Sequence, residues 1–300
     1  MSVKTILFVL FALFAISLMI FYFLPISTIN FSAKTGNYNF SINNESSNMQ
    51  FYSNMRFPSN IISYKIFNCP LQKKNDMEFA FDILENLTSL RFYLSNNEEI
   101  SVTCEERDRI NGGLFIAGEG GPTNITVAGV FKVITHGEIL LIKESDCPKP
   151  NVALHELLHV LGFEHSTNSE NIMYNITRCE QTIGDDMVQL INNIYSIQSN
   201  PDLTFRDVSA SMAGRFLNLN MTIVNEGLKD AGESKINVYA DGNLIKEIYL
   251  EPLEIGTGRI ITIGNIFVTQ ISINELELSI DSSFNEISKG NNKINLEIKK

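Results

Sequence analysis

The stretch "HELLHVLGFEHS", residues 155–166, decides how the middle of this chain folds and what it can bind. It holds three of the four histidines in a chain of 300 residues. His155 and His159 are four residues apart, so on a helix their imidazoles lie on one face, a turn apart. Residues 151–162 are mostly apolar and contain no proline, and this pattern predicts a helix.

The residues that follow complete a metal site. Gly162 comes one turn after His159, and a glycine there fits the left-handed end of a helix, which reverses the chain. The reversal would return His165 toward the first two imidazoles. Three imidazole ligands with an open fourth position are typical of catalytic zinc, and no cysteine lies nearby to close the site. Glu156 places a carboxylate where it can reach a water on the metal without binding the metal itself.

The spacing H-E-x-x-H-x-x-G-x-x-H fixes five positions, and a chance match in a chain of this length has odds of about one in ten thousand. The alternative is an ordinary buried helix in which the histidines are incidental. Three imidazoles and a carboxylate on such a helix would each need a buried hydrogen-bond partner. The sequence therefore favours the metal site.

This stretch resembles the zinc signature of the metzincin metalloproteases, and its surroundings resemble the matrixin family within that group. Ser166 follows the third histidine, and "SENIMYN" places Met173 eight residues beyond that histidine, at the position of a methionine turn. The segment "GDDMVQLINNIYS", residues 184–196, resembles the closing helix of a matrixin catalytic domain. Leu158 replaces a glycine that matrixins often carry, and we expect this to affect only helix packing.

The resemblance implies an α+β catalytic domain over residues 56–198, with a mixed β-sheet and a zinc-binding helix. It implies one catalytic zinc ion and an endopeptidase activity toward protein or peptide substrates. The implied roles are zinc ligands His155, His159 and His165, general base Glu156, methionine turn Met173, and candidate substrate-pocket residues Tyr174 and Ile176.

Other metals have weaker support. Matrixins often carry a second, structural zinc held by several histidines, but His136 is the only histidine left outside the cluster. Calcium is an option, because Asp108, Glu119 and backbone carbonyls between residues 112 and 121 could ligate it. The glycine-rich segment 108–124 that holds them is predicted to be a solvated loop.

The remaining elements of this region follow from composition and periodicity. Residues 60–68, 99–106 and 137–145 have strand composition, and residues 75–90 form an amphipathic helix with Ala80, Ile83, Leu84 and Leu87 on one face. In metzincins an edge strand holds the substrate backbone by strand addition. Either the strand at 137–145 or the segment 123–134 could have that role here.

Four cysteines, Cys69, Cys104, Cys147 and Cys179, all fall inside the presumed catalytic region. An even number outside the cytosol suggests two disulfides, for which three pairings exist. We favour Cys147 with Cys179, which would bracket the zinc helix and the methionine turn, and Cys69 with Cys104. A cysteine metal site is the alternative, but the chain has no C-x-x-C spacing.

Residues 1–24 include twenty successive residues without a charge, which is long enough to span a bilayer as a helix. Lys4 precedes this apolar run and no basic residue follows it closely, so we expect a cytoplasmic N-terminus and an extracellular catalytic domain. An uncleaved transmembrane anchor is favoured, and a cleaved signal peptide with a secreted product is the alternative. Residues 25–55, rich in Asn and Ser, are predicted to be a tether.

From residue 199 to residue 300 the sequence pattern changes, and apolar and polar residues alternate as they do in β-strands. Apolar residues recur at Leu217, Leu219, Met221 and Ile223, and Asp241-Gly242 is a hairpin signal. About seven short strands predict an all-β, immunoglobulin-like sandwich. The segments "PDLTFRDV" and "VNEG" resemble a CARDB domain, a module of prokaryotic surface proteins, which implies a spacer or binding role whose surface partner the sequence does not identify.

The formal net charge of −11, without a Lys/Arg cluster, argues against nucleic-acid binding. The sequence therefore predicts a zinc-dependent endopeptidase acting on extracellular proteins. The alternative function is a surface adhesion or scaffold protein whose protease-like domain carries zinc but is inactive. An intact Glu156 argues against this alternative, because an inactive domain has no need of a general base.

Overall fold

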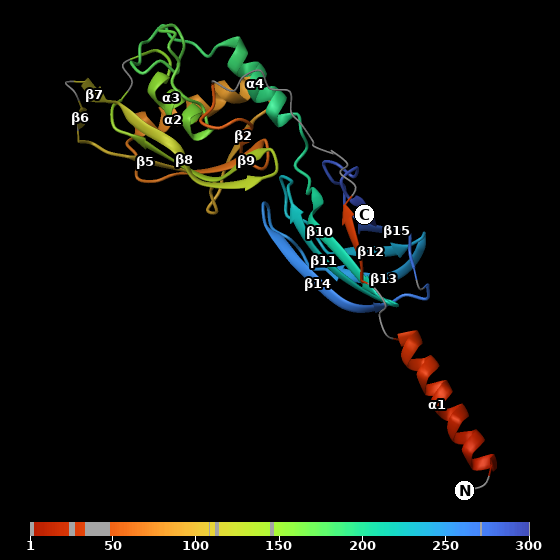
Figure 1. Ribbon diagram of the computed structural model, residues 1–300. Coiled ribbons are helices and arrows are strands. Elements are labelled where there is room, and N and C mark those ends of the chain that lie inside the picture. The colour runs from red at the N-terminus through yellow and green to blue at the C-terminus, as the bar shows by residue number, and fades with distance from the viewer. Residues whose placement is uncertain are drawn as a thin grey trace.

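The computed structural model describes residues 3–23, 28–33, 49–107, 109–111, 114–144, 147–270 and 272–299. The chain has an apolar helix, α1 (Val3–Phe23), an α/β domain that begins at residue 49, and a β domain formed by residues 28–33 and the strands from residue 203 onward. In Figure 1 the β domain lies between α1 and the α/β domain. This order in space differs from the order along the chain.

The α/β domain consists of a six-stranded sheet with its helices packed on one face, and a separate two-stranded sheet (Figure 1). Its helices are α2 (Leu71–Leu87), α3 (Asn151–Val160) and α4 (Asp185–Tyr195), and its strands are β2 (Met55–Arg56), β3 (Ile61–Ile66), β4 (Arg91–Leu94), β5 (Ile100–Cys104), β6 (Arg109–Asn111), β7 (Leu114–Ile116), β8 (Gly118–Ala128) and β9 (Phe131–Leu141). Strands β4, β3, β5 and β9 are mutually parallel, and β8 pairs antiparallel to β9. One continuous apolar core fills the space between the sheet and the helices.

Helix α2 starts earlier than the periodicity predicts. It begins at Leu71, directly after Pro70, and ends at Leu87. Its buried face includes Met77, Ala80 and Leu84, whereas Leu87 is 47% exposed. The predicted strands at 60–68, 99–106 and 137–145 correspond to β3, β5 and β9, the last starting six residues earlier.

The glycine-rich segment is not the loop that its composition suggests, because residues 118–124 form the first half of β8. A Cβ atom on Gly120 would overlap the backbone of Glu156, lying 2.9 Å from its Cα atom. A Cβ atom on Gly118 would lie 2.8 Å from Cγ of the same glutamate. The glycines therefore allow a strand to lie directly against helix α3, a use of glycine that composition alone does not reveal.

The β domain is one sheet that curls so that its two halves share a core. Its strands are β1 (Thr28–Ala33), β10 (Leu203–Ala213), β11 (Phe216–Asn225), β12 (Ser234–Ala240), β13 (Asn243–Leu250), β14 (Gly258–Phe267), β15 (Glu275–Ser282) and β16 (Lys293–Ile298). The strand order is β13-β12-β15-β16-β1-β10-β11-β14, and residues from both halves form a single apolar cluster. The four alternating residues of β11 are all buried, and Asp241 and Gly242 form the predicted hairpin with positive φ angles.

The segment predicted to be a tether contributes to both domains. Residues 28–33 form β1, which pairs antiparallel with β10 on one side and β16 on the other. Phe31 is 3% exposed and belongs to the core of the β domain. The free edges of β10 and β16 each need a strand partner, and β1 supplies it for both. Residues 49–55 pack on the α/β domain, and Phe51 donates its N–H to the Gly162 carbonyl at 2.9 Å.

The two domains meet in an apolar cluster. The turn between β8 and β9 places Ala128 and Phe131 against Leu228 of the β domain, with Ile255 and Ile287 packed at the border. The two domains approach each other closely at Gly256, because a Cβ atom on this residue would lie 2.5 Å from the Val127 carbonyl oxygen.

The connection between the domains has a defined path. Arg56 is fully buried and donates to the Ile197 carbonyl at 3.1 Å, while the Leu228 N–H donates to the Asn200 carbonyl at 2.9 Å. The connecting residues are therefore bonded to both domains, and we expect the pair to move as a unit.

A comparison of two glycines tests this contact. Gly256 and Gly242 both have positive φ, +70° and +80°, so alanine strains either backbone by about 1–2 kcal/mol. Only at Gly256 does the new methyl group meet the other domain. We expect Gly256→Ala to lower the free energy of unfolding by about 1–3 kcal/mol more than Gly242→Ala, as measured by urea denaturation. Equal losses would show that the contact contributes nothing.

Candidate metal centre

Helix α3 places three polar side chains in an apolar setting. His155, Glu156 and His159 are 5%, 7% and 7% exposed, although every other residue of the helix except Asn151 is apolar. The histidines fall one turn apart, as their spacing predicts. Because buried polar groups are costly without partners, each of these side chains requires an explanation.

The chain reversal after α3 brings a third imidazole to the same point. Gly162 has φ +95°, the left-handed conformation predicted for it, and a Cβ atom there would meet the side chain of Met55. His165 then lies with its Nε2 atom 3.3 Å from Nε2 of His155 and 3.1 Å from Nε2 of His159. These three residues form the one cluster of metal-ligating side chains found in the described part of the chain.

The other ring nitrogens show which way the imidazoles are protonated. Nδ1 of His155 lies 2.7 Å from the Ile172 carbonyl oxygen, and Nδ1 of His159 lies 2.8 Å from the Phe163 carbonyl oxygen. A carbonyl only accepts, so Nδ1 carries the proton in both rings and Nε2 presents a lone pair. Hence two lone pairs converge on His165, which has one Nε2–H at most to share between them. A cation at this point would satisfy all three nitrogens.

The surroundings of His155 and His159 favour the neutral form of these two imidazoles. Burial, together with the neighbouring imidazoles of His159 and His165, lowers the pKa of His155 to about 4, against the opposing effect of the Ile172 carbonyl. Burial also lowers the pKa of His159. Neutral imidazole is the form that binds a metal ion.

Glu156 is held in a tight apolar setting between α3 and β8. Burial, with a smaller contribution from the negative charge of Glu119, raises the pKa of its carboxyl to about 8. A divalent cation held nearby would favour the ionised carboxylate instead. A carboxyl group in this setting can exchange a proton near neutral pH.

Met173 is fully buried in the core of the α/β domain. Its turn is held by two hydrogen bonds, from the Met173 N–H to Oδ1 of Asn171 and from the Ser166 N–H to the Met173 carbonyl, both 2.8 Å. The preceding residue, Ile172, supplies the carbonyl that orients His155. The turn thus fixes one of the three imidazoles.

The chain beyond this turn holds the candidate pocket residues. Tyr174 is partly buried and Ile176 is 40% exposed. Gln181, which the sequence did not single out, is 1% exposed and donates to the carbonyls of Ser169 and Ile176 at 3.1 and 3.0 Å. A lone glutamine in a polar loop gave no signal of this organising role.

Phe51 also went unnoticed in the sequence. Its ring stacks on the imidazole of His159, with a centroid separation of 5.9 Å and an interplanar angle of 21°. It lies in the Asn- and Ser-rich segment predicted to be a tether, so no local pattern linked it to the site.

Both predicted disulfides are present, Cys69–Cys104 and Cys147–Cys179. The second joins the segment ahead of α3 to the loop beyond the methionine turn, and so encloses the three histidines within a loop of the chain. The Asn151 side chain supports the same connection, because its Nδ2 donates to the Arg178 carbonyl at 2.6 Å.

The calcium interpretation gains no support. Arg109 donates to both carboxylate oxygens of Glu119, at 3.2 and 3.3 Å, so this carboxylate already has a cationic partner. Asp108 lies outside the described residues.

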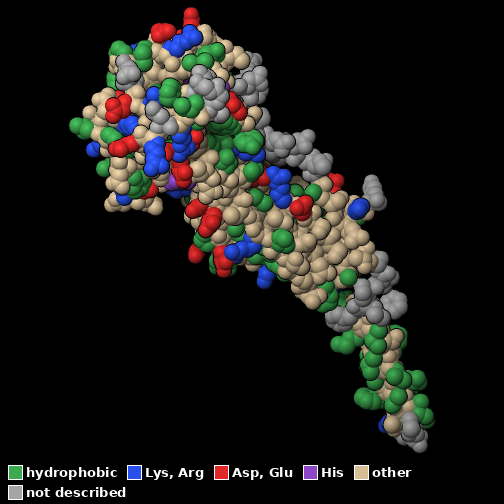
Figure 2. Space-filling model, turned by 90° about the vertical axis from the view of Figure 1, so that its left-hand side faces the viewer, with side chains coloured by type: hydrophobic (Ala, Val, Ile, Leu, Met, Phe, Trp, Pro, Cys, Tyr) green, Lys and Arg blue, Asp and Glu red, His purple; other side chains and the backbone are tan. Residues whose placement is uncertain are grey.

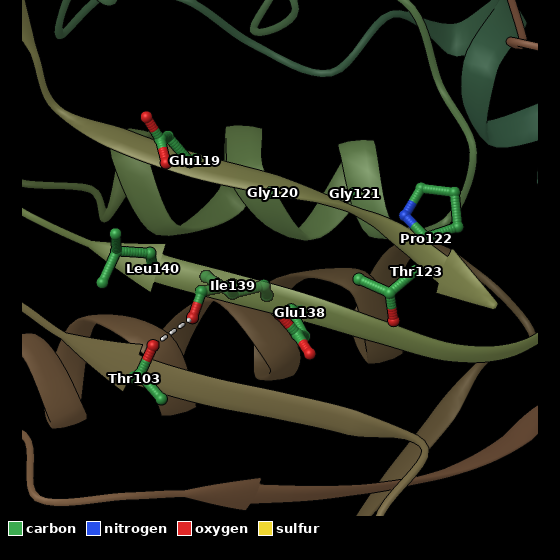
Figure 3. A pocket seen from close by; sticks show the side chains of 9 residues that line it. All are labelled: Thr103, Glu119, Gly120, Gly121, Pro122, Thr123, Glu138, Ile139 and Leu140. Atoms are coloured by element: carbon green, nitrogen blue, oxygen red, sulfur yellow. Dashed lines mark hydrogen bonds between the residues drawn. The ribbon is translucent and has the colours of Figure 1, made fainter.

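A shallow groove of about 350 Å³ lies on the face of the sheet away from the helices. In Figure 3 helix α3 lies behind the sheet, while Thr103, Glu138 and Leu140 line the open front face. The groove is thus separated from the histidines by the sheet itself.

Comparisons with known proteins match each domain separately. The Matrixin family model matches residues 56–196, and the CARDB model matches residues 200–296. No curated protein matches the chain.

Two of the matching solved structures are of the CARDB domain of the PF1109 protein from Pyrococcus furiosus. A crystal structure in complex with di-metal ions is 17% identical, covers 33% of this chain and 88% of that chain, and has a TM-score of 0.28. A solution structure is 19% identical, covers 33% of this chain and 94% of that chain, and has a TM-score of 0.29.

Proposed function

Because the chain carries a matrixin domain over residues 56–196 followed by a CARDB domain over residues 200–296, we propose that it is a zinc-dependent endopeptidase. The observation that carries this proposal is the convergence of the Nε2 atoms of His155, His159 and His165. Glu156 is buried and directly follows His155 on helix α3. We further propose that residues 56–198 have a metzincin fold and that residues 199–300 form an immunoglobulin-like domain.

The residues present fit a zinc ion. His155, His159 and His165 would hold it through Nε2, and two of these rings are oriented by carbonyls that bind Nδ1–H. Three nitrogen ligands leave a coordination position open, as catalytic sites require. When bound, zinc supplies a Lewis acid that polarises a carbonyl group and acidifies water to a pKa near 7.

Glu156 would move the proton. Its carboxylate accepts a proton from the attacking water and then donates it to the nitrogen of the leaving amine. Because the group is buried, its pKa lies close to the pH at which such a transfer is effective in both directions.

The substrate backbone would bind to β8. Strand β9 lies between β5 and β8, so it has no free edge, whereas β8 pairs with β9 alone among the described strands. A free edge offers unpaired N–H and C=O groups to an extended peptide. Since β8 contacts α3 through Gly118 and Gly120, a peptide on this edge would pass close to Glu156.

Helix α1 would anchor the enzyme in a membrane. It contains an 18-residue window of mean hydropathy 2.5, none of which is buried against the rest of the protein. Figure 2 shows hydrophobic side chains covering this helix. By the charge asymmetry of its flanks, the N-terminus would be cytoplasmic and both domains extracellular.

Metal removal tests the proposed activity. We expect the purified full-length chain to cleave a casein-type substrate, to lose this activity in a chelator, and to regain it with added zinc. We expect His159→Ala to lose bound zinc in elemental analysis, because one of three ligands is gone, whereas His136→Ala should retain it. Stoichiometric zinc without any cleavage of a mixed peptide library would support the scaffold alternative instead.

A further inference from the structure

The position of β1 determines which domain is next to the membrane. Helix α1 ends at Phe23, and Thr28 already pairs with Ala213 at the end of β10. Five residue steps span at most roughly 18 Å, so this end of the β domain cannot lie far from the end of the helix. The residues of the α/β domain follow β1 in the chain.

Aromatic side chains and one arginine lie together at this end. The register places Phe216 opposite both Ala213 and Phe267, so the three lie at one level of the sheet. The Phe216 and Phe267 rings are 6.1 Å apart, and Phe267 is 53% exposed. Arg215, in the turn between β10 and β11, places its guanidinium 4.4 Å from the ring centre of Tyr22 in α1.

These residue types match the surface of a bilayer. Aromatic rings are enriched at the level of lipid headgroups, and arginine extends its charge to phosphates while its stem stays among apolar groups. Tyr22 lies at the end of the apolar helix, where headgroups would begin. Its contact with Arg215 therefore continues the surface of the helix directly onto the β domain.

The opposite end of the β domain holds the α/β domain. Strand β10 runs for 11 residues from Leu203, beside the domain contact, to Ala213, beside α1. At about 3.3 Å per residue this strand separates the two ends by roughly 30 Å. The apolar contact at Phe131 and Leu228 keeps the domains together.

We propose that the β domain stands on the surface of the bilayer that α1 spans, through Arg215, Phe216 and Phe267, and holds the metal centre at least one domain length away from it. The inference rests on α1 being the membrane anchor of the proposed function, but not on catalysis. It implies that the substrates are polypeptide segments that stand clear of the membrane, not segments beside it.

The chain contains no tryptophan, so a single introduced indole reports its own surroundings. We would reconstitute full-length Phe267→Trp in phosphatidylcholine vesicles that carry a nitroxide on the headgroup. Phe79→Trp, in α2 of the α/β domain and 48% exposed, is the matched control. We expect emission from Phe267→Trp to fall at least about twofold relative to unlabelled vesicles, and emission from Phe79→Trp to stay unchanged.

A second tryptophan variant keeps the test valid if Phe267→Trp fails to fold. Thr269→Trp lies in the exposed segment after β14, at the same end of the domain, and should be quenched like Phe267→Trp. Unquenched emission from both variants would overturn the proposal, as would equal quenching of Phe79→Trp. Casein hydrolysis measured on the same vesicles reports the catalytic proposal separately, so an inactive but quenched protein would reject only the proposed activity.

Discussion

A Glu156→Gln variant is expected to keep its zinc and lose peptide hydrolysis by about 10²- to 10⁴-fold, the usual contribution of a positioned acid–base group. Glutamine preserves the shape of a side chain that is packed against Gly118, so the fold should be retained. It cannot accept a proton from water or return one to the leaving amine. The loss should therefore appear in kcat more than in KM.

Three measurements on one preparation decide this prediction: zinc content, kcat and KM for a fluorogenic peptide, and thermal unfolding. Glu170→Gln is the control, because Glu170 is exposed in the loop ahead of the methionine turn. It should leave all three values unchanged. Wild-type turnover in Glu156→Gln would show that Glu156 has no part in the mechanism. Loss of zinc would instead show that Glu156 is needed to hold the metal.

Gly120→Ala is expected to have the second largest effect, although the residue has no reactive group. The new methyl group would overlap the backbone of Glu156, so strand β8 and helix α3 must separate. Overpacking of this kind costs about 1–3 kcal/mol of stability. A displacement of about 1 Å between a substrate-binding strand and a catalytic group can reduce turnover by about 10²-fold.

The neighbouring glycine gives a matched control. A Cβ atom on Gly121 meets nothing within 4 Å, and the two residues are adjacent in the same strand. We expect Gly121→Ala to retain wild-type stability and activity in urea denaturation and peptide hydrolysis assays. If both variants behaved alike, the close approach of β8 to α3 would have no functional consequence.

The sequence alone was sufficient for several features that depend on neighbouring residues. Four-residue spacing placed His155 and His159 on one face of a helix, because the geometry of a helix is local. Gly162 marked the reversal, because few other residues tolerate a φ of +95°. Alternation in β11 and the Asp241-Gly242 hairpin were readable for the same reason.

Features that depend on distant residues came only from the tertiary structure. The glycines of β8 were interpreted as a loop, since nothing nearby showed that helix α3, over thirty residues later, would lie against them. Phe51 stacks on an imidazole that follows it by more than a hundred residues. The partners of β1 lie farther still, since they belong to strands that begin at Leu203 and Lys293.

One physical reason explains why the sequence alone determined some features and the tertiary structure decided the others. Helix periodicity, turn conformation and strand alternation are set by the backbone geometry of a few consecutive residues, so a sequence displays them directly. Strand pairing and close packing are set by which surfaces remain free after the rest of the chain has folded. The three histidines of the proposed metal centre could therefore be recognised within twelve residues. The strand packed against their helix, and the position of the β domain between them and α1, were decided by the assembled fold.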